Sequence, residues 1–305
     1  MTTSRPPLQR FWQRAQPGWV PEPEGADTWH EETRELQRRG IATEAALQFL
    51  HFERPDWEGF CAWLDGKCNA QPDDTSVEDV LDAQDLAFWE EHGYLVLKQA
   101  VPADACSAAR DAIWEFLGAS PDEPASWYRP HEAKYGLMLT LFDHAALEQN
   151  RRSARIRNAY RQLYGSAAIF KSIDKVSFNP PENETFHFLG SGLHWDVSLE
   201  PPIPYCLQGL LYLSDCGPDD GAFHCVPGFH HKLEDWLHSL PPGADPRETA
   251  KRTLRGSPVP GKAGDFVIWH QALPHCATPN RGTKPRLVQY LTYLPDIDTS
   301  QKSWR

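Results

Sequence analysis

One short segment of the chain alternates a histidine with a carboxylate, His194-Trp-Asp196. If the surrounding residues Leu193–Leu199 form a strand, the two side chains point to the same face, because residues two apart on a strand share a face. A β-sandwich interior excludes an unpaired carboxylate, so the pair belongs either to a functional site or to the solvent-facing side of the strand. The pair alone does not separate these two interpretations.

A second segment supplies two more histidines and an arginine. The apolar run Asp265–Trp269 leads into a turn that carries His270 and His275, and Arg286 begins the next apolar run. Two histidines and one carboxylate form the facial triad that binds iron(II) and leaves coordination positions open, and either histidine of the turn could complete it. A keto acid could occupy two of these positions, and its far carboxylate would suit the planar guanidinium of Arg286.

The first part of the chain has the pattern of helices. The Pro-rich first ~20 residues predict an extended arm, and Thr28–Arg39 predicts a helix. Residues 76–79 have the form of a capping box that opens a helix, which Gly93 would end. Pro102 opens a further helix, whose apolar face comprises Cys106, Ala109, Ile113, Phe116 and Leu117.

Short strands dominate the second half of the chain. They are separated by turns rich in proline, glycine and aspartate, which favours a closed or double-sheet β fold, with a jelly roll among the candidates. The predicted strands are Tyr94–Leu97, Ser172–Phe178, Leu193–Leu199, Cys206–Leu213, Ala222–Val226, Asp265–Trp269 and Arg286–Leu294.

Composition narrows the class of protein. The 305 residues are 40% hydrophobic and carry a net charge of −12, so the chain predicts a packed core and argues against nucleic acid or an anionic membrane as a partner. No secretory signal and no membrane-spanning run are visible. Seven cysteines without paired spacing predict reduced thiols in a cytoplasmic protein. The sequence carries no signal for an oligomeric state.

These segments together resemble the phytanoyl-CoA dioxygenase family of iron(II)/2-oxoglutarate-dependent oxygenases. The resemblance covers roughly residues 88–295, and the interval from His275 to Arg286 is specific to the family. The chain differs at Pro227-Gly-Phe-His230, where the family commonly has serine in place of the phenylalanine, and residues before about Asp85 have no counterpart. The matching segments are Phe88–Leu97, Asn179–Pro181, His194–Asp196, Asp220–His230, Gly264-Asp265, His275 and Arg286.

The resemblance implies a mainly β fold with a helical buttress, namely a double-stranded β-helix (jelly roll, cupin-like) core. We expect an N-terminal arm and helical extension over residues 1–85 and the oxygenase core over residues 86–305, within one compact domain. The resemblance assigns iron(II) to His194, Asp196 and His275. It assigns 2-oxoglutarate to Arg286, with Thr278 and Lys175 as further contacts and O2 as the second cosubstrate. His270 is then left to packing.

The implied reaction is hydroxylation of a small organic metabolite with release of succinate and CO2. A coenzyme A thioester would need a basic groove, whereas acidic and apolar residues flank the motifs, and the basic run Arg151–Arg161 predicts a solvated helix face. We therefore expect a neutral or cationic substrate. Two alternatives remain: a zinc-dependent hydrolase, with Glu184 or Glu200 as the base, and a catalytically silent jelly-roll binding module. The flanking acids are Glu182, Glu184, Glu200, Asp219 and Asp220.

Overall fold

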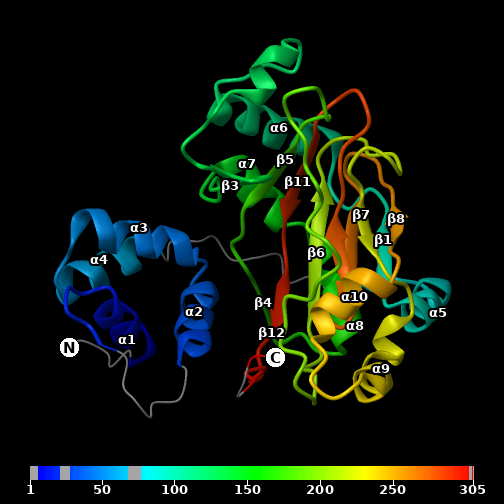
Figure 1. The fold of residues 1–305 in the computed structure, drawn as a ribbon. Coiled ribbons are helices and arrows are strands. Elements are labelled where there is room, and N and C mark those ends of the chain that lie inside the picture. The colour runs from blue at the N-terminus through cyan, green and yellow to red at the C-terminus, as the bar shows by residue number, and fades with distance from the viewer. Residues whose placement is uncertain (1–5, 21–27, 68–76, 302–303, 305) are drawn as a thin grey trace.

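The computed structural model describes residues 6–20, 28–67, 77–301 and 304. Its strands form three antiparallel sheets, drawn in Figure 1. The strands are β1 (Tyr94–Leu97), β2 (Lys134–Tyr135), β3 (Met138–Leu139), β4 (Ile169–Lys171), β5 (Val176–Asn179), β6 (Leu207–Tyr212), β7 (Phe223–Cys225), β8 (Ser257–Val259), β9 (Phe266–His270), β10 (His275–Ala277), β11 (Arg286–Tyr290) and β12 (Tyr293–Pro295). A large sheet has the order β1-β9-β6-β11-β5-β3-β2, a small sheet the order β10-β7-β8, and β12 pairs with β4.

Helices pack on the large sheet and also form a separate group at the N-terminal end of the chain (Figure 1). They are α1 (Pro6–Arg14), α2 (Trp29–Arg38), α3 (Thr43–Glu53), α4 (Trp57–Lys67), α5 (Ala83–His92), α6 (Ala103–Leu117), α7 (Ala145–Arg151), α8 (Ala154–Tyr164), α9 (Leu233–Ser239) and α10 (Pro246–Thr253). Within the described ranges, no helix is long and apolar enough to cross a membrane.

Side-chain alternation in the large sheet produces two buried layers. On β6, Leu207 and Leu211 pack against α6 and α8, whereas Leu210 and Tyr212 pack toward the small sheet. β9 and β11 alternate in the same way, because Phe266 and Ile268 join the helical layer while Val267 and Val288 join the layer between the sheets. The small sheet therefore covers the face of the large sheet that the helices leave open. This is the helix-buttressed jelly roll that the sequence predicts.

The N-terminal helices form a lobe with its own core. Residues of α1–α4 bury a cluster that includes Leu8, Phe11, Leu36 and Phe60, separate from the two layers of the jelly roll. We call α1–α4 the N-terminal lobe. The prediction of an extended arm is wrong for residues 6–14, because the two prolines there stand in the first turn of α1, where a missing N–H costs no hydrogen bond.

The helix before the first strand begins later than the sequence predicts. Residues 77–80 are not helical, and Ser76 lies outside the described residues. α5 is capped instead by Asp82, whose side chain accepts from backbone N–H groups while the Asp85 side chain bonds back to the backbone of Asp82. Gly93 ends the helix as predicted, with a φ of 71° that favours glycine.

Three predicted strands are also corrected. The strand predicted over 172–178 begins only at Val176, as β5, because residues 172–175 are not in a strand. The segment 193–199 forms one isolated bridge, between His194 and His275, and no strand. The run 286–294 divides into β11 and β12, which belong to different sheets, because β11 pairs with β5 and β6 whereas β12 pairs with β4.

The basic run after residue 150 is not a single solvated helix face. It spans the end of α7 and the start of α8, and its members differ in environment. Arg155 is exposed, as predicted, but the side chain of Arg151 is only 2% exposed. Its guanidinium donates to the carbonyls of Phe142 and Asp174, at 2.9 and 3.0 Å, so Arg151 is part of the interior.

Candidate metal centre and catalytic pocket

His194, Asp196 and His275 meet between the two sheets, and their donor atoms lie within 4.8 Å of one another. Asp196 lies between the two imidazoles: its Oδ2 is 3.1 Å from Nε2 of His275, and its Oδ1 is 3.7 Å from Nε2 of His194. The isolated bridge brings the two histidines together, with N–H···O distances of 2.9 and 3.0 Å between their backbones. Two imidazoles and one carboxylate match the donor set that holds non-haem iron(II).

Each histidine is oriented by a contact of its Nδ1, the ring nitrogen that does not face Asp196. Nδ1 of His194 is 2.9 Å from the carbonyl of Gly192, and Nδ1 of His275 is 3.1 Å from the carbonyl of Leu273. A carbonyl can only accept, so each Nδ1 carries the proton and each Nε2 is left with the lone pair that a metal ligand needs. Burial, followed by His275, lowers the pKa of His194, which keeps this ring in the neutral form that a metal requires.

Asp196 is held by backbone contacts on either side of it rather than by a strand. The guanidinium of Arg247, on α10, donates to the carbonyls of Trp195 and Val197, both at 2.7 Å. The indole N–H of Trp195 donates to the carbonyl of Ala272 at 2.9 Å, and this side chain is 2% exposed. These contacts fix the carboxylate's position, and sequence reasoning did not identify Arg247.

Gln208 adds a direct contact to the carboxylate. Its amide N–H donates to Oδ2 of Asp196 at 2.8 Å, and its carbonyl accepts from the indole of Trp269 at 2.9 Å. Burial would raise the pKa of Asp196, but the contacts with His275 and Gln208 outweigh the effect of burial and hold this pKa well below its usual range. In the sequence, Gln208 could have been identified as a polar residue inside the otherwise apolar run that forms β6.

Arg286 lines the same pocket and is 1% exposed. Its Nη1 donates to the carbonyl of Gly221 at 2.8 Å and its Nη2 to the hydroxyl of Ser177 at 3.0 Å, while its Nε has no partner. Within the described residues, no carboxylate forms an ion pair with this guanidinium. A buried cation of this kind suits an anionic ligand.

Ser177 is a pocket residue that sequence reasoning missed. Its hydroxyl accepts from Arg286, and its strand β5 begins directly after Lys175. Lys175 also lines the pocket, but its ammonium pairs with Glu44 of the N-terminal lobe. The hydroxyl of Thr278 donates to the carbonyl of Ala222 at 3.1 Å, and Thr278 is not among the residues that line the pocket.

His270 lies on the opposite face of β9 from the pocket. Alternation places it with Phe266 and Ile268, away from Val267 and Trp269. Its Nδ1 accepts the backbone N–H of Ala272 at 2.9 Å, so this ring is not in the His-Asp-His group. Burial, followed by its histidine neighbours, lowers the pKa of His270 to about 4.

The pocket that contains these residues has a volume of about 590 Å³ and lies between the large and small sheets. Leu137, Met138, Phe188, Leu210 and Phe223 give it an apolar lining. The metal-binding group, the buried Arg286 and this apolar lining together suit a small molecule and an anionic cosubstrate.

A family model described as Phytanoyl-CoA dioxygenase (PhyH) matches residues 89–288, more than half of the chain. The chain belongs to this family. A curated relative, "Putative phytanoyl-CoA dioxygenase" of Dictyostelium discoideum, is 27% identical over 96 residues. That match covers 29% of this chain and 27% of the relative, so the chain spans about a quarter of the relative's length.

Solved structures share the fold at low sequence identity. AviO1 from Streptomyces viridochromogenes has a TM-score of 0.52 at 17% identity, covering 74% of this chain and all of that one. HygX from Streptomyces hygroscopicus, solved with nickel and 2-oxoglutarate, has a TM-score of 0.52 at 16% identity. The match covers 72% of this chain and 89% of HygX. The epimerase SnoN, solved with Fe3+, alpha ketoglutarate and nogalamycin RO, has a TM-score of 0.51 at 16% identity. The match covers 72% of this chain and 93% of SnoN.

These likenesses confirm the jelly-roll fold class. Membership of the family, together with the His-Asp-His donor set, confirms iron(II), 2-oxoglutarate and O2 as the expected cofactors. One of these related structures is an epimerase, so the shared fold does not by itself specify the reaction.

Proposed function

We propose that this protein is an iron(II)/2-oxoglutarate-dependent oxygenase that hydroxylates a small organic metabolite. His194, Asp196 and His275 hold the iron, and Arg286 binds the far carboxylate of 2-oxoglutarate. When bound, iron(II) and 2-oxoglutarate activate O2 so that one oxygen atom enters a substrate C–H bond and the other enters succinate, with release of CO2. The remaining roles belong to the chain's own residues.

These residues position the metal ligands and the cosubstrate. Gln208 and Arg247 hold Asp196 in place, one through its carboxylate and the other through the flanking carbonyls. Ser177 orients the guanidinium of Arg286 and adds a hydroxyl on the cosubstrate side of the pocket. Lys175 stays a proposed cosubstrate contact because it lines the pocket. Thr278 stays a proposed contact that requires its hydroxyl to leave the carbonyl of Ala222.

The observation that carries the proposal is Arg286. It is buried in the same pocket as the three metal-ligand candidates and has no ion pair among the described residues. A zinc-dependent hydrolase does not use a buried cation such as Arg286. It also needs a general base, and neither Glu184 nor Glu200 lines the pocket. A silent binding module has no need for a metal-binding group beside a buried cation. Oxygenase chemistry with a dicarboxylate cosubstrate uses both.

The charges in the pocket support a neutral or cationic substrate. Besides Asp196 and Arg286, the charged lining residues are Asp174 and Lys175, and Lys175 is paired with Glu44. The pocket thus offers no surplus of cations for the phosphates of a coenzyme A thioester. We also propose a cytoplasmic location, supported by the free thiols of Cys106, Cys206, Cys216, Cys225 and Cys276.

Substrate-stimulated succinate formation tests the proposal. The protein is incubated with iron(II), 2-oxoglutarate and a panel of neutral or amine-bearing metabolites, with phytanoyl-CoA as the rival substrate, and products are identified by mass spectrometry. We expect a hydroxylated product from a panel member. Stimulation by the thioester alone contradicts the substrate class. Metal analysis after anaerobic purification separates the alternatives, since the hydrolase would carry zinc and the silent module would carry no metal.

A further inference from the structure

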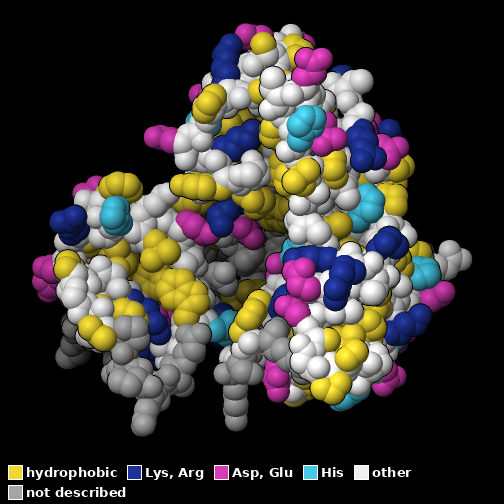
Figure 2. Space-filling view, viewed as in Figure 1, with side chains coloured by type: hydrophobic (Ala, Val, Ile, Leu, Met, Phe, Trp, Pro, Cys, Tyr) yellow, Lys and Arg dark blue, Asp and Glu magenta, His cyan; other side chains and the backbone are white. Residues whose placement is uncertain are grey.

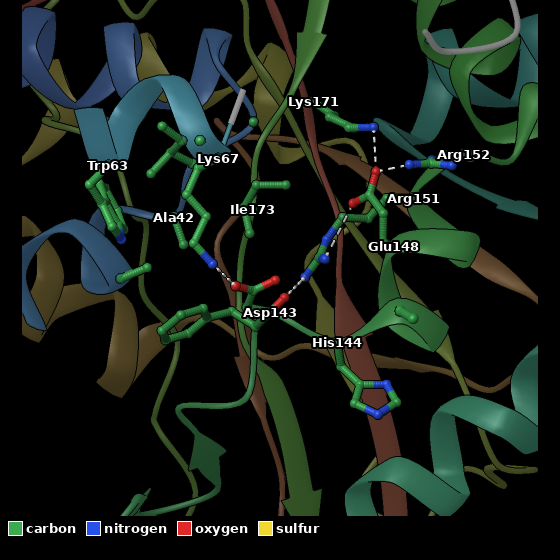
Figure 3. A pocket seen from close by; sticks show the side chains of 16 residues that line it. Ala42, Trp63, Lys67, Asp143, His144, Glu148, Arg151, Arg152, Lys171 and Ile173 are labelled. Atoms are coloured by element: carbon green, nitrogen blue, oxygen red, sulfur yellow. Dashed lines mark hydrogen bonds and ion pairs between the residues drawn. The ribbon is translucent and has the colours of Figure 1, made fainter. Parts of the chain in front are cut away.

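The segment 171–175 separates two pockets of the molecule. Figure 2 shows a hollow between the N-terminal lobe and the jelly roll, with acidic and basic side chains on its wall. Lys171 and Ile173 line a cavity of about 380 Å³ there, shown from close by in Figure 3. Asp174 and Lys175 line the catalytic pocket instead. The charged residues at the end of this segment therefore belong to the catalytic pocket.

Asp174 is an acid of the catalytic pocket that the proposed mechanism does not use. Among the described residues that line this pocket, the acids are Asp174 and Asp196, and Asp174 forms no ion pair with any described residue. Its Oδ1 accepts the backbone N–H of Lys175 at 2.7 Å. Its Oδ2 accepts no hydrogen bond within the described ranges, and the residue is only part-buried, so this oxygen is accessible from the pocket.

Burial raises the pKa of Asp174, which is the direction expected for a carboxylate without a cationic partner. Such a carboxylate suits a ligand that carries a positive charge, because a charge-assisted hydrogen bond offsets the cost of taking the carboxylate out of water.

The cations next to Asp174 are each paired with another acid. The ammonium of Lys175 pairs with Glu44 of α3. Arg151 donates to the backbone carbonyl of Asp174, at 3.0 Å, and its acidic partner is Glu148, 3.6 Å away across the cavity wall drawn in Figure 3. Two carboxylates and one ammonium, those of Glu44, Asp174 and Lys175, leave one negative charge on this side of the catalytic pocket when all three are ionised.

Asp174 lies within a small molecule's reach of the metal-binding group. The backbone N–H of Tyr290, on β11, donates to the carbonyl of Lys175 at 3.1 Å, and Tyr290 lies opposite Leu210 on β6. Neighbouring strands lie about 4.8 Å apart, so the backbones of Lys175 and Leu210 are separated by roughly 10 Å. Gln208, two residues before Leu210 on the same strand face, holds the metal-ligand carboxylate.

Aromatic side chains line the space in between. They are Phe188, Phe223, Trp269 and Tyr290. The ring centroids of Phe223 and Trp269 are 4.4 Å apart, and they lie 5.8 and 5.2 Å from the ring of His275. Aromatic faces pack against hydrocarbon and also attract cations, so this wall suits the carbon chain of an amine.

We propose that Asp174 binds the ammonium group of an aliphatic amine substrate and thereby determines which substrates the catalytic pocket accepts. This role rests on the proposed oxygenase function and narrows its substrate from a neutral or cationic metabolite to an amine. The Asp174 carboxylate accepts hydrogen bonds from the ammonium group, and the carbon chain lies along the aromatic wall toward His275. Asp174 is a specificity-determining residue and takes no part in the oxidation.

Calorimetric titration of the full-length protein tests this role. The titrations are anaerobic, with iron(II) and 2-oxoglutarate present, so that binding is measured without turnover. The probes are butylamine and hexylamine, with 1-butanol and 1-hexanol as uncharged counterparts of the same chain length. We expect at least one amine to bind about tenfold or more tightly than its alcohol, and Asp174→Asn to abolish this preference while changing alcohol affinity less than about twofold.

Asp174→Asn keeps an oxygen that can accept the backbone N–H of Lys175, so the fold should persist, and circular dichroism verifies each variant. Asp111→Asn is the matched control, because it removes one carboxylate from an exposed position on α6, outside the catalytic pocket. Its affinity for the amines should stay within about twofold of the wild type.

Glu44→Gln tests the charge balance from outside the catalytic pocket. Without this partner, the ammonium of Lys175 is available to pair with Asp174 and competes with the amine. Amine affinity should therefore fall about threefold or more, while alcohol affinity should not change.

Absence of amine binding, equal affinities for amines and alcohols, or an amine preference that survives Asp174→Asn overturns the proposed role. Failure of the oxygenase proposal has a different signature. In that case no succinate forms with any member of the metabolite panel, while amine binding that depends on Asp174 persists.

Discussion

His275 and His270 flank the same turn but have different environments. His275 joins the group with His194 and Asp196, whereas His270 faces the helical side of β9. We predict that His194→Ala and His275→Ala each abolish iron(II) binding and turnover while leaving the fold intact, and that His270→Ala retains a substantial part of both. Anaerobic titration with iron(II) and circular dichroism measure these effects. If the His270→Ala variant were inactive and the His275→Ala variant active, the ligand assignment would be wrong.

Arg286 gives a second prediction at the scale of single residues. Its replacement by alanine removes the partner proposed for the far carboxylate of 2-oxoglutarate. Losing a buried, charge-assisted pair costs on the order of 2–5 kcal/mol, so the KM for 2-oxoglutarate should rise roughly 30-fold or more. Arg286→Lys should restore only part of the loss, because an ammonium lacks the planar fork. An unchanged KM in the alanine variant would remove the main support for this cosubstrate.

His270 predicts a pH dependence of stability. Its pKa in the folded protein is lowered to about 4 by burial and by its histidine neighbours, below the ordinary value of 6.5. The unfolded chain therefore takes up this proton first as the pH falls. The stabilisation is fully present above pH 6.5 and is lost toward pH 4, by at most about 3 kcal/mol. Urea unfolding from pH 7 to pH 4 should show a flatter profile for His270→Gln than for the wild type. Parallel pH profiles of unfolding free energy for the two proteins would contradict this prediction.

At the scale of elements, the metal-binding loop depends on α10. Residues 193–199 lack strand partners apart from one bridge, and Arg247 supplies hydrogen bonds to the carbonyls on either side of Asp196. We predict that Arg247→Met weakens metal affinity about tenfold, the low end of the range for contacts that orient metal ligands. Calorimetry with cobalt(II) measures this effect without turnover. Arg252→Met, an exposed position on the same helix, is the control and should have wild-type affinity.

At the scale of the whole molecule, α2 attaches the N-terminal lobe to the jelly roll. The buried guanidinium of Arg34 donates to the carbonyls of Pro295 and Ile297, at 2.7 and 2.9 Å. Arg38 makes an exposed pair with Asp296 at 2.6 Å, and both arginines stack on Phe170. The two residues therefore make a matched comparison between a buried and an exposed contact.

Arg34→Met should lower the free energy of unfolding by about 2–3 kcal/mol, because the hydrogen bonds that a buried, charged guanidinium donates to two carbonyls are lost. Arg38→Met should cost less than about 1 kcal/mol, because an exposed ion pair is screened by water. Urea denaturation compares the two variants. Equal losses would mean that the lobe is not held by the buried contact.

Local features of the sequence determined several elements and the chemistry of the site. The bounds of β1 agree with the predicted strand, and α2 lies within a residue of its predicted ends. α6 begins one residue after Pro102, as predicted, because caps, prolines and period-two patterns act over a few residues. The His-x-Asp pair and the interval from His275 to Arg286 indicated the metal site. Residue type alone restricts these groups to a few chemical uses, and the resemblance to the family was needed to prefer His275 over His270.

The tertiary structure decided everything that depends on partners distant in the sequence. Local alternation predicted a strand at 193–199, but the chain there bonds to Arg247 and His275 instead of to neighbouring strands. Gln208 and Ser177 became candidate site residues only when the fold placed them beside Asp196 and Arg286. Likewise, the basic run became one wall of a pocket because the N-terminal lobe packs opposite it. Such contacts form through long-range packing, which short-range patterns do not encode.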